Sequence, residues 1–496
     1  MKICLLSDAY EESESPMKEH DLPCDPSAYF PEAEWERAEL IKATAVREVI
    51  RLAQRHYDLF FNLCDGAWDD DRPGIEVVQT LERLGQAFTG ANSEFYEPSR
   101  EAMKRVCRAW GVDTPAGFVV RGDADLERAL DELRFPLIVK HPSSYSSIGL
   151  TRASRVETAA ALRERVGEMA GAYGAALVEE FVAGREFTVL VAENPDDAAE
   201  PTTYTPIEFR FPKGETFKHF DLKWVDYAGM RDLPVDDLEL ETRLRDASAR
   251  LFRGLHGAGY GRCDLRVDAE GRAWMLEINP NCGVYYTPSD PGSADLCLLH
   301  DPAGHTGFTG QVIAAALARR ARRRRSWEAR ATREGEYGLF ATRAIAAGET
   351  VIAFEEEPHT LVSRERVEHG WGEPQRGWFD RYAWPLSDEV WVMWGRDPED
   401  WKPIDHACEP SAWLAGLDVV ARRDLAPGEE ITLDYATFCN ERMPGFACRC
   451  GAAECRGTIR GDDLLQGFVA RYGEHVSDYV RRRRADAGVA VSGGSG

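Results

Sequence analysis

The fold of the first part of the chain is decided by two segments, Gly261-Arg-Cys-Asp264 and Trp274-Met-Leu-Glu277-Ile-Asn279-Pro-Asn-Cys-Gly283. We expect them to form two antiparallel strands, which would bring the side chains of Asp264, Glu277 and Asn279 together. A carboxylate inside an otherwise apolar strand is costly to bury unless a metal or another cation accompanies it. Three oxygen ligands, completed by nucleotide phosphates, suit the octahedral shell of Mg²⁺. The two segments therefore predict a magnesium site.

Segments upstream and between supply groups that suit a nucleotide. Residues 135–140 are predicted to form a buried strand that ends in Lys140, and the loop 142–149 after it is rich in small residues. Backbone N–H groups and hydroxyls of this loop could cradle phosphate oxygens, with a plain turn as the alternative. Residues 176–186 are predicted as strand, connector and strand; they could bind adenine through backbone groups, or form a hairpin with exposed acids. Lys223 supplies another cation.

Strands and helices alternate over the first part of the chain, which favours a parallel sheet. A helix is predicted over residues 34–55, with Val46, Val49, Ile50 and Ala53 on one face. The other predicted elements are strands over 3–7 and 58–64, a helix over 74–84 and a strand that ends at 88–90.

An Arg-rich run, Arg319-Arg-Ala-Arg-Arg-Arg-Arg325, separates this part from the rest. It is interpreted as a helix end or a solvated linker, with an anionic docking site as the alternative. Strands dominate after it, at residues 350–354, 417–421 and 431–433, with Gly and Pro turns between them. The two parts are therefore predicted to have different folds.

Three cysteines are closely spaced in Cys448-Arg-Cys450-Gly-Ala-Ala-Glu-Cys455. This C-x-C-x₄-C spacing, with Gly in the knuckle, is typical of zinc ligands, and three thiolates need a fourth ligand for tetrahedral Zn²⁺. Cys408 and Cys439 are the candidates for that ligand. Three unrelated buried cysteines are the alternative interpretation.

The first part of the chain, about residues 1–318, resembles the ATP-grasp superfamily, most closely its D-alanine–D-alanine ligase branch. The motifs that carry the resemblance are Arg262-x-Asp264, Glu277-x-Asn279 and Gly283, preceded by Phe61-Asn62, Thr89-Gly90 and Lys104. The resemblance implies an α/β fold with a parallel-sheet subdomain at 1–98 and an α+β ATP-grasp domain at 99–318. In this family ATP lies between two antiparallel sheets.

The same resemblance implies a role for each matching residue. Arg262 would stabilise an acyl-phosphate intermediate, while Asp264, Glu277 and Asn279 would hold Mg²⁺. The ATP-binding residues would be Arg100, Lys140, Ser146, Ser147, Glu179, Glu180, Phe181, Val182, Glu186 and Lys223. Glu186 would contact the ribose and residues 179–182 the adenine. The implied reaction joins a small-molecule carboxylate to an amine while ATP is cleaved.

The second part, about residues 327–460, resembles a SET-domain methyltransferase with a post-SET zinc motif. The matching segments are Gly335-Glu-Tyr-Gly338, Asp405-His-Ala-Cys408 and Leu433-Asp-Tyr435, followed by the cysteine array. The resemblance implies a mostly-β pseudoknot domain at 327–440 and a zinc motif at 441–460. The remaining segments would be an Arg-rich linker at 319–326 and a C-terminal helix with a flexible tail at 461–496.

The SET resemblance also implies site residues. S-adenosylmethionine would lie against Glu336, Tyr337, Gly338, Asp405 and His406, and Tyr435 would be catalytic. Cys408 would complete the zinc site with Cys448, Cys450 and Cys455. The methyl acceptor would be a small amine, or a lysine of a peptide or protein. Candidates for an aromatic acceptor channel, with hydrophobic core as the alternative, are Tyr382, Trp384, Trp391, Trp394 and Phe438.

We therefore expect a multidomain enzyme with two activities, ATP-dependent carboxylate–amine ligation and N-methylation. One alternative is a protein-lysine methyltransferase whose ATP-grasp half binds a nucleotide for regulation, and another is an inactive interaction scaffold. A formal net charge of −25 opposes nucleic-acid binding. Uninterrupted apolar runs are too short for a membrane span or a signal peptide, so a cytoplasmic location is expected.

Overall fold

The computed structural model describes residues 1–9, 18, 24–68, 71–143, 149–197, 199–222, 229–323, 325–332, 337–356, 359–394 and 401–489. The chain divides into two compact units, Met1–Arg323 and Arg324–Gly496. Among the described helices, none is long and apolar enough to cross a membrane.

A three-stranded parallel sheet begins the first unit. Its strands are β1 (Lys2–Asp8), β2 (Glu34–Leu40) and β3 (Leu59–Asn62), in the order β2-β1-β3. Helices α1 (Ala45–Ala53) and α2 (Ile75–Arg83) follow β2 and β3. The predicted strands over 3–7 and 58–64 and the helix at 74–84 are confirmed. The strand predicted to end at 88–90 is reduced to an isolated parallel bridge between Phe88 and Phe60.

The helix predicted over 34–55 is wrong in its first part. Residues 34–40 form β2, which pairs with β1 along its whole length, so tertiary hydrogen bonding overrides a helix-like composition. The expected apolar face is also wrong in part. Helix α1 begins only at Ala45 and buries Ala45, Val49 and Leu52, whereas Val46 and Ile50 are about two-fifths exposed.

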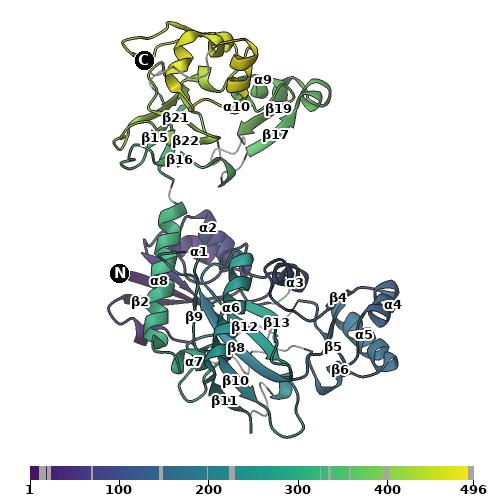
Figure 1. The fold of residues 1–496 in the computed structure, drawn as a ribbon. Helices are drawn as coiled ribbons and strands as arrows, with labels where there is room; N and C mark the ends of the chain where they lie inside the picture. Colours follow the sequence, from purple (N-terminus) through teal and green to yellow (C-terminus); the bar gives the residue numbers. More distant parts are fainter. Residues whose placement is uncertain are drawn as a thin grey trace. The chain divides into compact units, whose positions relative to one another are not determined.

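A small antiparallel sheet forms a lobe of its own in the first unit. Its order is β4-β7-β5-β6. The strands are β4 (Gly117–Val120), β5 (Leu137–Lys140), β6 (Arg155–Val156) and β7 (Ala176–Glu180). Helices α4 (Asp123–Glu132) and α5 (Ala159–Tyr173) pack beside it and share its apolar core (Figure 1).

A larger sheet has the order β11-β10-β8-β12-β13, with β9 added to β8 (Figure 1). Its strands are β8 (Arg185–Ala192), β9 (Thr202–Thr203), β10 (Ile207–Arg210), β11 (Arg231–Pro234), β12 (Tyr260–Val267) and β13 (Ala273–Pro280). The remaining helices of the unit are α3 (Arg100–Ala109), α6 (Leu238–Gly254), α7 (Ser293–Leu299) and α8 (Gly304–Arg323). The predicted antiparallel pairing of the two acidic segments is confirmed, because β12 pairs with β13 and Asp264 stands opposite Glu277.

The Arg-rich run begins as the end of α8, so residues 319–323 are helical rather than part of a linker. The contacts of Arg319 explain why the helix continues into this run. Its guanidinium forms an ion pair with the buried carboxylate of Glu193 at 2.7 Å and donates to the carbonyl oxygens of Phe88 and Gly90. Arg319 therefore ties the helix end to the rest of the unit.

The second unit is mostly β. One sheet has the order β14-β15-β23-β20, with β20 (Asp405–His406) parallel to β23 (Glu430–Leu433). The other strands are β14 (Trp327–Ala331), β15 (Tyr337–Ala341), β16 (Thr350–Ile352), β17 (His359–Ser363), β18 (Ala383–Pro385), β19 (Val390–Trp394), β21 (Ala412–Ala415), β22 (Asp418–Ala421), β24 (Phe446–Ala447) and β25 (Thr458–Ile459). Helices α9 (Glu373–Tyr382) and α10 (Asp478–Asp486) complete it.

A buried ionic cluster joins α3 to the small sheet. The carboxylate of Glu179, on β7, lies 2.5 Å from the Lys104 ammonium and 2.8 Å from that of Lys140. Lys104 also donates to the carbonyl oxygen of Pro115 at 2.7 Å. Burial of Glu179 opposes its ionisation, but the two lysines outweigh this effect and hold its pKa at about 2.

The depressed pKa of Glu179 predicts an acid-sensitive contribution to stability. This contribution is complete above the unfolded pKa of about 4.5 and disappears as the pH falls through the folded value of about 2; its size is about 3 kcal/mol. Denaturant titrations should show E179Q less stable than the wild type at pH 7, with the gap narrowing between pH 5 and pH 2. If the free energies of unfolding of the two proteins changed in the same way with pH, the depressed pKa of Glu179 would be contradicted.

Candidate active sites

A pocket in the first unit takes its lining from both antiparallel sheets. Ten residues predicted from the sequence line it: Arg100, Lys140, Glu179, Glu180, Phe181, Val182, Glu186, Arg262, Asp264 and Glu277. The predicted residues Ser146, Ser147 and Lys223 lie outside the described residues. The fold of the first unit therefore brings together predicted residues that are up to 177 positions apart in the sequence, Arg100 on α3 and Glu277 on β13.

The acids of the predicted magnesium site lie within hydrogen-bonding reach of one amide. The Asn279 Nδ2 is 3.3 Å from an Asp264 carboxylate oxygen and 3.2 Å from one of Glu277. Arg262 donates twice to Asp264, at 2.9 and 3.1 Å, and Arg100 forms an ion pair with Glu277. Carboxylate and amide oxygens are ligands that Mg²⁺ prefers, so this donor set fits the ion.

The connector between β7 and β8 contributes Phe181 and Val182 to the pocket lining. The Phe181 N–H donates to the carbonyl oxygen of Pro136 at 2.9 Å, while the Glu180 carboxylate turns outward to Arg134. Arg266, which the sequence analysis missed, is buried here and donates to the carbonyl oxygen of Val182 at 2.6 Å. Its position opposite Glu186 follows from the pairing of β8 with β12, which the sequence did not reveal.

A second cation that the sequence analysis missed is Lys218, which also lines the pocket. Burial lowers the pKa of Lys218 to about 8, although the negative charges of Glu186 and Asp264 act in the opposite direction. Its ammonium lies 3.1 Å from the centre of the Phe209 ring. A lysine between two aromatic residues, as in Phe217-Lys-His-Phe220, was the available sequence signal.

The second unit brings the predicted S-adenosylmethionine residues of two strands together. A Cβ on Gly338 would lie 3.4 Å from a carboxylate oxygen of Asp405 and 2.7 Å from one of Glu430, so both side chains lie close to the Gly338 backbone. Tyr337, next to it, is half exposed and its ring lies 5.4 Å from that of Trp401. Glu336 lies outside the described residues.

Tyr435 is fixed by two hydrogen bonds. Its hydroxyl donates to the carbonyl oxygen of Ile404 at 2.8 Å, and its backbone N–H donates to Nδ1 of His406 at 3.2 Å. Burial and Arg456 lower the pKa of His406 to about 4 against the effect of Asp434, so the imidazole is neutral at pH 7.

The aromatic residues proposed for an acceptor channel divide into two groups. Trp384, Trp391 and Trp394 are buried in the hydrophobic cores of the second unit, so the core interpretation holds for them. Phe438 packs against the edge of one core and also lies beside Tyr435, with ring centres 5.6 Å apart. The ring of Tyr382 lies 4.3 Å from that of Trp378. Phe446, not singled out from the sequence, packs on the Tyr435 ring at 5.9 Å.

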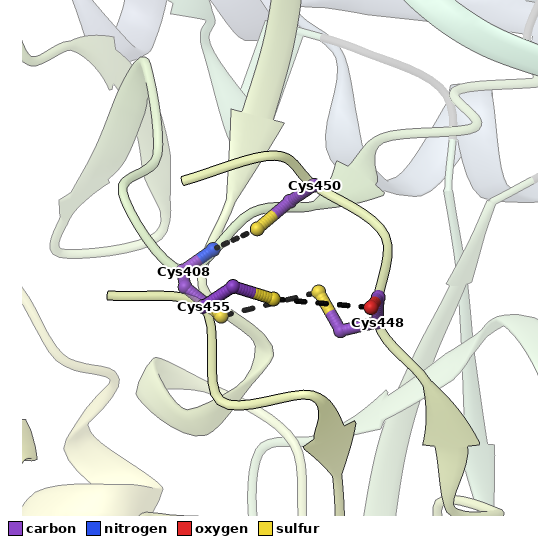
Figure 2. A group of neighbouring side chains, drawn as sticks. All are labelled: Cys408, Cys448, Cys450 and Cys455. Carbon is purple, nitrogen blue, oxygen red and sulfur yellow. Dashed lines mark hydrogen bonds between the residues drawn. The ribbon is translucent and has the colours of Figure 1, made fainter. Parts of the chain in front are cut away.

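Four cysteines form a cluster whose sulfur atoms lie within 4.8 Å of one another (Figure 2). They are Cys408, Cys448, Cys450 and Cys455; Cys439 is not among them. The sulfurs of Cys408 and Cys448 are 3.9 Å apart, close to the separation of about 3.8 Å between thiolates in a tetrahedral zinc site. Burial opposes ionisation of Cys450, but N–H groups of Cys408 and Ala452 and neighbouring thiols lower its pKa to about 7. The donor set fits Zn²⁺.

Comparison with known proteins assigns both units to families. A family model described as "D-ala D-ala ligase C-terminus" matches residues 112–289, and one described as "SET domain" matches residues 336–436. The chain is 32% identical to the D-alanine–D-alanine ligase of Chromohalobacter salexigens over 231 residues, which are 46% of this chain and 67% of that protein. It is also 32% identical to the Bordetella petrii enzyme over 246 residues, 49% of this chain and 72% of that one.

A crystal structure of the D-alanine–D-alanine ligase from Bacillus anthracis has a TM-score of 0.48 and 20% identity, covering 65% of this chain and 99% of that one. The sheets described above agree with the predicted α/β architecture followed by a mostly-β unit. The first unit therefore makes this chain a member of the D-alanine–D-alanine ligase family of the ATP-grasp superfamily, and its second unit contains a SET domain.

Proposed function

We propose that the first unit is an ATP-dependent carboxylate–amine ligase and that the SET domain methylates an amine with S-adenosylmethionine. The observation that carries the ligase is the contact of Asn279 with Asp264 and Glu277, two acids that line the same pocket as Arg262 and Lys140. The related enzymes join D-alanine to D-alanine. For this chain the proposal extends to a carboxylate and an amine.

The ligase proposal gives each pocket residue a task. ATP would supply the phosphoryl group, and Mg²⁺ would neutralise the charge of its oxygens. Asp264, Glu277 and Asn279 would hold Mg²⁺, Lys140 would contact phosphate oxygens and Glu186 a ribose hydroxyl. The substrate carboxylate attacks the γ-phosphorus and ADP leaves; the amine then attacks the acyl carbon, loses its proton, and phosphate leaves. Arg262 would stabilise the negative charge of that acyl phosphate.

The methyl-transfer proposal rests on the surroundings of Tyr435. An alkylamine with a reference pKa of about 10.4 must lose its proton before it can attack a methyl group, and an apolar site lowers that pKa by desolvation. The rings of Phe438 and Phe446 provide apolar surface beside the Tyr435 ring. The Tyr435 hydroxyl would align the amine with the methyl group of S-adenosylmethionine.

The two activities would act on one product, because tethering raises the effective concentration of an intermediate. The methyl acceptor would then be the amide formed by the first unit or its amine substrate. A protein-lysine methyltransferase whose first unit only binds a nucleotide is the competing proposal, and the experiments below separate the two.

The cysteine cluster should carry one Zn²⁺ per chain. Because a structural zinc contributes folding energy directly, C450S should lose the metal and destabilise the second unit while ATP binding by the first unit persists. Elemental analysis and thermal unfolding measure both effects. C439S, which removes a thiol outside the cluster, is the matched control and should keep its zinc; a folded, untreated wild type without zinc would defeat the assignment.

ATP should be cleaved to ADP and phosphate, because an acyl phosphate and not an adenylate is formed. E277Q removes the charge of one magnesium ligand and should abolish the cleavage with little change in folding. E208Q makes the same change on β10, outside the pocket lining, and should keep the activity. Chromatography of the nucleotides measures the products. Release of AMP that depends on the substrate would identify an adenylating enzyme instead.

Y435F should slow methyl transfer by roughly 10²-fold or more, since it removes one positioned hydroxyl and keeps the ring. Binding of S-adenosylmethionine and cleavage of ATP should persist. Y479F removes a hydroxyl that bonds Arg483 and Asp388 in the same unit, and should leave the methylation rate unchanged. Radiolabelled methyl transfer measures the rates.

The identity of the methyl acceptor separates the two proposals. If the activities are coupled, extracts containing E277Q accumulate no methylated amide, whereas the wild type does. Full methylation of a protein acceptor by residues 326–496 alone, with no methylation of any small amide, would overturn the coupled function. Mass spectrometry of extracts with and without the chain detects either product.

A further inference from the structure

Lys218 lies on the segment between β10 and β11, and buried neighbours hold it in place. Phe217 is 6% exposed and packs edge-on against Phe181, while His219 is 1% exposed and lies 3.2 Å from the Glu215 carboxylate. Arg152 in turn forms an ion pair with Glu215 at 2.5 Å. These contacts fix the backbone on both sides of Lys218, so the direction of its side chain is determined by the fold.

The strand register locates the ammonium group of Lys218. Phe209, Glu186 and Arg266 form one row across β10, β8 and β12. The Lys218 ammonium sits over the Phe209 ring in this row, at 3.1 Å from its centre. The carboxylates whose charges act on it most are Glu186, in the same row, and Asp264, two residues away along β12. Lys218 thus lies beside the proposed ribose contact, at the ribose end of the interval between that contact and the proposed magnesium site.

A nucleoside triphosphate must place its phosphates in that interval, because they connect the ribose to the metal. Three other cations of the pocket contact carboxylates of the protein: Arg100 contacts Glu277, Lys140 contacts Glu179, and Arg262 contacts Asp264. Each of these three cations is therefore held against a carboxylate of the protein. A cation over Phe209 adds positive charge where the phosphate nearest the ribose would lie.

We propose that Lys218 is a further phosphate-contacting residue of the nucleotide site, and that its ammonium binds the phosphate group nearest the ribose. This assignment rests on the proposed ATP-binding function of the first unit. It adds a cation that neither the sequence motifs nor the family comparison assigns. Because the contact is to phosphate alone, it strengthens the binding of nucleotides and leaves the binding of nucleosides unchanged.

The test compares ATP, ADP and adenosine binding to the full chain with Mg²⁺ present. K218M should bind ATP and ADP roughly 10- to 100-fold more weakly, the usual effect of losing one charge-assisted hydrogen bond. Its affinity for adenosine, measured by competition with a labelled nucleotide, should stay within about twofold of the wild type. K218R should recover part of the ATP affinity. Calorimetry and circular dichroism report binding and folding.

K213M is the matched control, because Lys213 is an exposed lysine on the same segment and its removal changes the net charge equally. Its affinities should equal those of the wild type. Unchanged ATP affinity in K218M, or an equal loss of adenosine affinity, would overturn the phosphate contact. A wild-type chain that binds no ATP would instead overturn the nucleotide site itself, and this failure is seen before any variant is made.

Discussion

The register of β12 with β13 is the constraint on which the nucleotide pocket depends. Antiparallel pairing sets Asp264 opposite Glu277 and Arg262 opposite Asn279, so four polar side chains gather at one place on the sheet. A shift of one residue would send each of these side chains to the other face. The central position of β12, between β8 and β13, leaves no room for such a shift, because β8 fixes the same strand from its other side.

Three acids of the pocket are each paired with at least one cation. Glu179, Asp264 and Glu277 each contact a lysine or arginine, and these contacts make the burial of carboxylates tolerable. A bound magnesium ion and a polyphosphate would exchange these partners: the metal would draw on the acids, and the phosphates on the cations. The pocket therefore contains both positive and negative side chains before any ligand binds. The chain as a whole has a formal net charge of −25.

In the second unit a single buried carboxylate links the cysteine cluster to Tyr435. Asp434, which precedes that tyrosine, is 1% exposed and accepts hydrogen bonds from Arg456 at 2.7 and 3.1 Å and from the Tyr472 hydroxyl at 2.7 Å. The backbone N–H of Arg456 points to the Cys408 sulfur at 3.4 Å. The segment after Cys455 thus holds both a predicted zinc ligand and the residue beside the proposed catalytic hydroxyl.

Features that depend on spacing along one strand or one loop could be predicted from the sequence. The two-residue spacing of Glu277 and Asn279 places both on one face of a strand, and the cysteine spacing at 448–455 brings three thiols together locally. The choice of Cys408 over Cys439 came from family resemblance, and the tertiary cluster contains Cys408.

Features that depend on segments distant in the chain could not be predicted in this way. Residues 34–40 have a helix-like composition, yet form a strand because β1 offers them a complete set of backbone partners. Arg266 and Lys218 became pocket residues through the pairing of β8 with β10 and β12. The contact of Arg319 with Glu193 decided between a helix end and a linker, the two interpretations that the sequence left open. The physical reason is common to all three: burial and pairing depend on neighbours that local periodicity does not encode.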